Sequence, residues 1–134
     1  VKYYMWNAFM YQFKREVARA QAADPTAVRC ESVTVIDLKG VDSSQMNNKT
    51  IETLKSVVLI GCCFPELLNQ MVILNASFAF NMVWKLIKQF LSARTVAKIE
   101  IFSNEKAGKQ RLLEIIDKKE LLTDYGGGGP SFEQ

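Results

Sequence analysis

The residue types that most often carry chemistry in proteins are scarce in this chain of 134 residues. It contains no histidine, which removes the commonest general base and the commonest metal ligand. The three cysteines are Cys30 and the adjacent pair Cys62 and Cys63, which have neither metal-ligand spacing nor the even number of a disulfide framework. We interpret them as small core residues of a protein in a reducing, cytoplasmic setting.

The carboxylates offer no catalytic pattern either. Asp37, Glu66 and Asp117 are not paired at any defined spacing, so salt bridges or helix caps explain them better than acid–base catalysis. The net charge of +3 comes from scattered Lys and Arg, which does not indicate nucleic acid but suits an anionic membrane. We therefore predict no enzyme, no metal and no cofactor other than a bound lipid.

The apolar residues are more informative, above all those from Met71 to Phe102. This stretch divides into a short apolar run, a helix-length run that is apolar nearly all round, and a second short run with strand alternation. The predicted helix, from about Phe78 to Leu91, leaves few residues for water, mainly Asn81, Lys85, Lys88 and Gln89. A helix of this kind is either buried on both sides or faces a lipid or a membrane.

Further elements surround this unit. Apolar spacing predicts helices over about 2–22, 50–63 and 104–116, the last with Leu112, Leu113 and Ile116 as its buried side. The β-branched run Val33–Leu38 is typical of a strand buried on both faces of a parallel sheet. The alternation of strands and helices predicts one α/β domain, with a mostly parallel, mixed sheet flanked by helices.

The glycine run 126–129 has two interpretations. A flexible linker toward the tail 130–134 is favoured over a phosphate-binding nest, because no helix start follows to supply a dipole. This divides the chain into a domain over residues 1–125 and a linker with a tail over 126–134.

Short motifs follow one another in a specific order. They are Val33–Leu38 with Lys39-Gly40, Phe64-Pro65-Glu66, Ile73-Leu74-Asn75-Ala76, the aromatic and basic residues from Phe78 to Leu91, Thr95-Val96-x-Lys98-Ile99, and Tyr125-Gly126-Gly127. This ordered set resembles the CRAL-TRIO lipid-binding domain over roughly residues 1–129. The resemblance implies a cage with a sheet as its floor and a mobile gate helix as its lid. It also implies that the first strands and the N-terminal helical bundle of the family are missing here.

The resemblance assigns roles by position. The gate residues are Phe78, Phe80, Val83, Trp84, Ile87 and Phe90, and the pocket floor is Val35, Ile36, Ile73, Ile99 and Ile101. Lys85 and Lys88 are candidates for contact with headgroups or a membrane, although a solvated helix edge is the more frequent explanation of two lysines. The implied function is binding and transfer of a phospholipid or other small lipophile by a cytoplasmic, peripheral membrane protein.

A second hypothesis belongs to another class. Ser77 stands where the family usually has proline, and Gly128 where its phosphatidylinositol binders often have lysine. These departures and the missing segments suit a divergent module that acts as a structural or protein-interaction subunit. Another protein chain would then complete the sheet or cover the apolar helix.

Overall fold

The computed structural model describes residues 2–26, 31–61 and 67–131, and gives the backbone alone for residues 2–10, 12, 54 and 57–61. In chain order the elements are α1 (Lys2–Ala23), β1 (Ser32–Asp37), the 3-10 helix η1 (Ser43–Gln45), α2 (Asn48–Gly61), β2 (Leu68–Leu74), α3 (Phe78–Ile87), the 3-10 helix η2 (Lys88–Phe90), α4 (Ala93–Val96), β3 (Ile99–Ile101), α5 (Glu105–Ile115) and the 3-10 helix η3 (Thr123–Tyr125).

The strands form a parallel sheet in the order β1-β2-β3. Its register places Val35 beside Val72 and Ile36 beside Ile73, which in turn lies beside Ile101. Neighbouring residues in such a register point to the same face of the sheet. The predicted α/β class is confirmed, and both described strand pairs are parallel.

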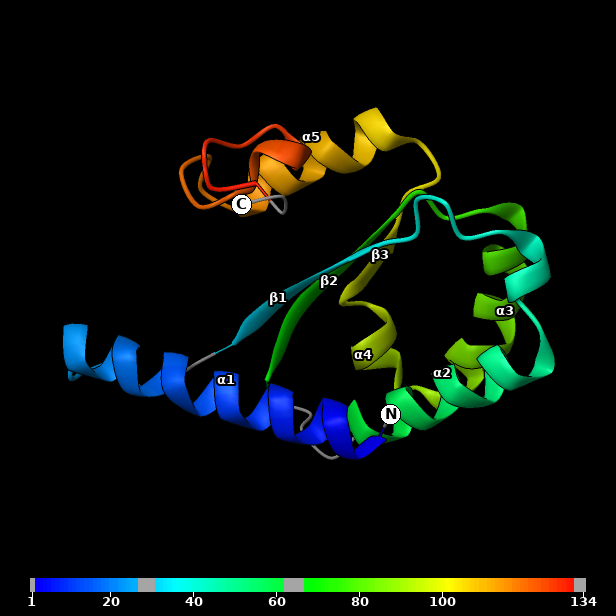
Figure 1. Cartoon of the computed structure of the whole chain (residues 1–134), viewed down its shortest axis with the longest axis horizontal. Coiled ribbons are helices and arrows are strands. Elements are labelled where there is room, and N and C mark those ends of the chain that lie inside the picture. The colour runs from blue at the N-terminus through cyan, green and yellow to red at the C-terminus, as the bar shows by residue number, and fades with distance from the viewer. Residues whose placement is uncertain (1, 27–30, 62–66, 132–134) are drawn as a thin grey trace.

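The sheet separates two groups of helices (Figure 1). Helix α5 and the C-terminal segment cover one face, and helices α3 and α2 lie on the other. The α5 face has a buried core of Val72, Leu74, Leu112 and Leu121. The α3 face has a core of Ile73, Ala76 and Phe80. Alternate residues of β2 therefore contribute to the two cores, as the pleat of a strand requires.

Strand β1 differs from its prediction. A strand buried on both faces was expected, but Val33 and Ile36 keep 38% and 37% of their surface exposed. The reason is position, because β1 is an edge strand of the sheet that the described residues form, whereas β2 is central. Apolarity along a strand does not distinguish these two places.

The stretch from Met71 to Phe102 also departs from expectation in detail. Strand β2 begins earlier, at Leu68, and β3 covers only Ile99–Ile101. Part of the second apolar run forms α4 instead, because Ser92 caps a helical turn by accepting a hydrogen bond from the Thr95 amide at 3.1 Å. The helix prediction for 78–91 divides into α3 and η2.

Helix α5 packs closely on the sheet through Gly108. A Cβ at this position would lie 2.4 Å from Leu74 Cδ2 and 3.3 Å from Phe102 Cβ. Leu112 of this helix is fully buried against the sheet. Leu113 is 43% exposed, so the assignment of Leu113 to the buried side was wrong. Asn104 caps the helix by accepting a hydrogen bond from the Ala107 amide at 3.1 Å.

The glycine run is hydrogen-bonded rather than free. The amides of Gly127, Gly128 and Gly129 donate to the carbonyls of Leu122, Lys118 and Leu121. A Cβ on Gly127 would lie 1.8 Å from the Leu121 oxygen, so this close approach requires glycine. These contacts place residues 126–129 against the preceding segment, while the division of the chain into a domain and a linker after residue 125 stays a prediction.

Helix α1 spans Lys2–Ala23, close to the predicted range, and passes below the amino ends of the strands (Figure 1). Several other predictions lie outside the described residues: the core role of Cys30, Cys62 and Cys63, and the motif Phe64-Pro65-Glu66. The described residues include no helix long and apolar enough to cross a membrane.

Candidate functional site

Helix α3 is apolar on two opposite sides. Phe80, Val83 and Ile87 point inward and are at most 6% exposed. Phe78, Met82 and Leu86 follow one another at intervals of four residues and form an outer stripe, exposed by 81%, 50% and 50%. Residues four apart lie on the same side of a helix, so this outer stripe is continuous. Phe90 extends it by one more interval and is 53% exposed.

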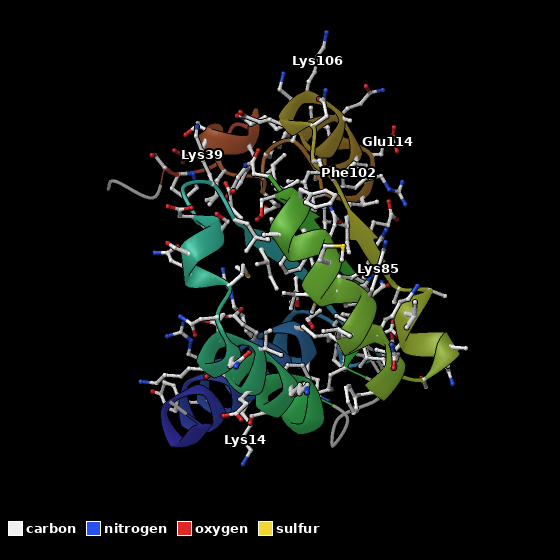
Figure 2. The ribbon with its side chains drawn as sticks, turned by 90° about the vertical axis from the view of Figure 1, so that its right-hand side faces the viewer. Lys14, Lys39, Lys85, Phe102, Lys106 and Glu114 are labelled. Carbon is white, nitrogen blue, oxygen red and sulfur yellow. The ribbon has the colours of Figure 1, made fainter. Side chains whose placement is uncertain are left out.

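The inner side of α3 lies against the sheet. Phe80 forms a core with Ile73 and Ala76, and partly buried apolar side chains pack around it, namely Leu38, Met46, Met71, Trp84, Ile99 and Ile101. Figure 2 looks onto the outer side of α3, which lies in front of the strands, with Lys85 on the lower half of the helix.

The structure brings together four of the five predicted floor residues. Ile73, Ile99 and Ile101 pack in the core beneath α3, and the register places Ile36 on the same face. Val35 instead packs against the core on the α5 face. It does not lie with the other four, because neighbouring residues of a strand point to opposite faces.

The predicted gate residues are divided between the two sides of the helix. Phe80, Val83 and Ile87 are buried, Trp84 is partly buried, and Phe78 and Phe90 are exposed. Met82 and Leu86, which the site prediction omitted, complete the outer stripe. Their spacing from Phe78 was the signal for them, and it is visible in the sequence.

Both ends of α3 are held by specific contacts. At its start, Ser77 Oγ accepts a hydrogen bond from the Phe80 amide at 3.2 Å, and Asn81 Nδ2 donates to Ser103 Oγ at 3.4 Å. Beyond its end, the Phe90 ring lies 5.2 Å from the Lys55 ammonium of α2, within range of a cation–π interaction.

The sequence segment that contains α3 carries charge of one sign. No Asp or Glu occurs between residues 67 and 99, whereas Lys85, Lys88, Arg94 and Lys98 do. Lys85 and Lys88 are exposed beside the outer stripe. Among the described residues no carboxylate pairs with either ammonium.

A polar cluster lies at the carboxyl ends of β1 and β2. The Asp37 carboxylate accepts hydrogen bonds from Asn75 Nδ2 at 2.7 Å, from the Lys39 amide at 2.8 Å and from the Tyr125 hydroxyl at 3.4 Å. Burial pushes the pKa of Asp37 upward, but these hydrogen bonds outweigh it and the pKa is lowered. The pKa of Tyr125 is raised by burial and by the Asp37 charge.

A hollow lies on the α5 face of the sheet. A cavity of about 180 Å³ opens there, lined by Val35, Ile116, Glu120, Leu121, Leu122 and Tyr125. It is separated by the sheet from the residues under α3. The described part of the chain holds no group of three or more Cys, Asp or Glu side chains placed to bind a metal ion.

These elements define an α/β domain in which a helix with two apolar sides lies over a parallel sheet. Residues 5–127 match the family model described as the CRAL/TRIO domain, and the chain belongs to this family. The resemblance drawn from the motifs is thereby confirmed.

The similar proteins include one that is a phospholipid transfer protein by name. The phosphatidylinositol/phosphatidylcholine transfer protein SFH12 of Arabidopsis thaliana is 38% identical over 98 residues, which are 72% of this chain and 18% of that protein. The SEC14 cytosolic factor of Yarrowia lipolytica is 34% identical over 101 residues, which are 75% of this chain and 20% of that protein. The chain thus spans about a fifth of the length of these relatives.

A solved structure shares the fold. The crystal structure of Sfh5 superposes with a TM-score of 0.52 at 23% identity, over 78% of this chain and 34% of that one.

Proposed function

We propose that this chain binds a hydrophobic lipid between the inner side of α3 and the sheet, with α3 as the gate. The observation that carries the proposal is the two-sided apolarity of α3, with Phe80, Val83 and Ile87 inside and Phe78, Met82 and Leu86 outside. A helix that only covered a sheet needs one apolar side. The second, outer apolar side suits a helix that moves from water into a lipid environment.

The ligand is a phospholipid or another small lipophile. The name of one similar protein includes phosphatidylinositol/phosphatidylcholine transfer, and another is named SEC14 cytosolic factor; these names support this class of ligand. The walls on the α3 face are Ile36, Ile73, Ile99 and Ile101 with Trp84. Each methylene buried there contributes about 0.8 kcal/mol, so an acyl chain needs no charged anchor to be held. The proposal requires no catalytic group.

The outer stripe and its lysines fit a transient membrane partner. Phe78, Met82 and Leu86 would enter the interface while Lys85 and Lys88 meet anionic headgroups. The protein would then act at the cytoplasmic surface of a membrane without crossing it.

The test compares two substitutions on one strand. Ile36 and Val33 are almost equally exposed but lie on opposite faces of β1. The purified chain, loaded from phosphatidylcholine and phosphatidylinositol vesicles, is extracted with organic solvent and the lipid is counted by mass spectrometry. We expect a stoichiometric lipid in the wild type and in Val33→Trp, and at least a fivefold loss in Ile36→Trp, whose ring fills the α3 side. A wild-type chain that never carries lipid would refute the proposal.

The second candidate is a structural or protein-interaction module. The exposed Val33 and Ile36 on the edge strand β1 favour it, because an apolar edge strand suits pairing with another chain. In that case Val33→Trp and Ile36→Trp would both weaken a complex with the partner, and neither would change lipid content.

A further inference from the structure

The chain between β2 and α3 is a short joint with an unusual backbone. Only Ala76 and Ser77 separate Asn75 from Phe78, the first residue of α3. Asn75 has φ of 55°, and it is the one non-glycine residue in the left-handed region among those described. Asparagine tolerates this conformation better than most residues.

The partner of Asn75 comes from another strand. Its side-chain amide donates to the Asp37 carboxylate at 2.7 Å, and Asp37 ends β1. The Lys39 amide donates to the same carboxylate oxygen, Oδ1, at 2.8 Å. The Asp37 carboxylate therefore fixes the joint from which α3 departs, and it does so across 38 residues of sequence.

The second oxygen of Asp37 is bound from the other side of the molecule. The Tyr125 hydroxyl donates to Oδ2 at 3.4 Å, and the Tyr125 ring packs against the core on the α5 face. Tyr125 is held in place because Gly126 has φ of 89° and the Gly127 amide donates to the Leu122 carbonyl at 3.0 Å. The C-terminal segment thus reaches past the end of the sheet to the joint of α3.

We infer that Asp37 and Tyr125 are positioning residues for α3, so that the C-terminal Tyr125-Gly126-Gly127 segment controls how readily this helix leaves the sheet. The inference rests on the proposed function in one respect, namely that α3 is the element that moves. Figure 2 shows the setting, with Lys39 and Phe102 marking the upper ends of β1 and β3 beside the start of α3.

The physical argument concerns which restraint yields first. The inner side of α3 is buried, and the segment after its C-terminal end is held by the contact of Phe90 with Lys55. A helix that swings away from the sheet would therefore turn at the least regular backbone position beside it. That place is Asn75. Removing the Tyr125 hydroxyl leaves Oδ2 of Asp37 with one donor fewer and loosens the carboxylate that orients Asn75. Hinges are commonly a few residues at the end of an element.

Hydrogen exchange of the lipid-free chain tests this inference. We expect Tyr125→Phe to raise the exchange rates of the Val83 and Ile87 amides in α3 about fivefold, the effect of one hydrogen bond, and to leave the Leu112 amide of α5 unchanged. Tyr11→Phe, at an exposed tyrosine on α1, is the matched control and should change neither helix.

A double variant keeps the test specific to the pair. Asp37→Asn alone should also accelerate exchange in α3, and adding Tyr125→Phe should change it little further, because both substitutions break one network. Equal acceleration in α3 and α5, or no acceleration in α3, would overturn the inference. Because no lipid is present, these results stand even where the extraction experiment finds that the chain carries none.

Discussion

Glu100 is a charged residue in a short strand, and its partners explain why it is tolerated. Its carboxylate accepts hydrogen bonds from Arg111, with Nε to Oε2 and Nη2 to Oε1 both at 2.9 Å and Nε to Oε1 at 3.2 Å, and a further one from Gln70. Arg111 also reaches Glu114 at 2.9 Å. This fork joins β3 to α5 and to β2, and paired donors of this kind are the stronger class of ion pair.

The same contacts predict how acid affects the protein. The hydrogen bonds and the charge of Arg111 lower the pKa of Glu100 although partial burial opposes them. The unfolded chain therefore binds a proton at Glu100 more readily than the folded one. The contribution of this group to stability is complete above its ordinary pKa of about 4.3 and is lost as the pH falls through the lower folded value.

We expect Glu100→Gln to flatten the acid limb of the stability curve. The free energy of unfolding, measured in urea between pH 7 and pH 3, should fall less steeply below about pH 4.3 than in the wild type. Glu120→Gln changes an exposed carboxylate on the same side of the sheet and serves as the control. The explanation fails when the Glu100→Gln curve has the same slope as the wild-type curve.

At the scale of elements, the glycines of the C-terminal segment allow two stretches of backbone to pack closely together. Residues 126–129 return along 118–122, where Leu122 and Gly129 form an isolated bridge. This return buries Leu121 and places Tyr125 against the core on the α5 face. The position of Tyr125, and with it the contact to Asp37, depends on backbones that approach too closely for any side chain.

Two neighbouring glycines give a direct test of this packing. We expect Gly127→Ala to destabilise the protein by about 1–3 kcal/mol, because its Cβ would lie 1.8 Å from the Leu121 oxygen and the backbone must shift. Gly128→Ala would meet only the Lys118 oxygen at 3.5 Å, an ordinary contact, and should change stability by no more than about 0.5 kcal/mol. Chemical denaturation measures both, and equal effects would contradict the description of the segment.

At the scale of the whole molecule the segment that contains α3 and the α5 side differ in the charges that they carry. The segment from residue 67 to residue 99, which includes β2 and α3, has no carboxylate. The α5 side has exposed charges of both signs, for example Glu105 with Lys109 at 2.8 Å. A bilayer with anionic headgroups would therefore meet the α3 side first.

Vesicle binding should follow this asymmetry. We expect Lys85→Ala with Lys88→Ala to weaken binding to phosphatidylserine-containing vesicles about thirtyfold, since each lysine near such a surface contributes about 1 kcal/mol. Lys106→Ala with Lys118→Ala removes the same charge from the α5 side and should have little effect. Raising the salt concentration should reduce the difference between the two variants. Co-sedimentation measures both, and equal losses would reject α3 as the docking side.

The sequence by itself determined the local choices. Periodic apolar spacing indicated α1, α2, α3 and α5, and the β-branched run indicated β1, because these signals come from residues close along the chain. The caps at Ser77 and Asn104 are equally local. The two-sided apolarity of α3 also needs no structure, since every fourth residue from Phe78 to Phe90 is apolar.

Only the tertiary structure decided which residues meet. It placed Val35 on the α5 face and Ile36 on the α3 face, made β1 an edge strand, and joined Asp37 to Asn75 and Tyr125 across 38 and 88 residues. Contacts so distant in sequence leave no periodic signal, because register and chain reversal arise only when separate elements pack together. The apolar pattern of helix α3 is thus visible in the sequence, while the cluster that we propose controls this helix exists only in the fold.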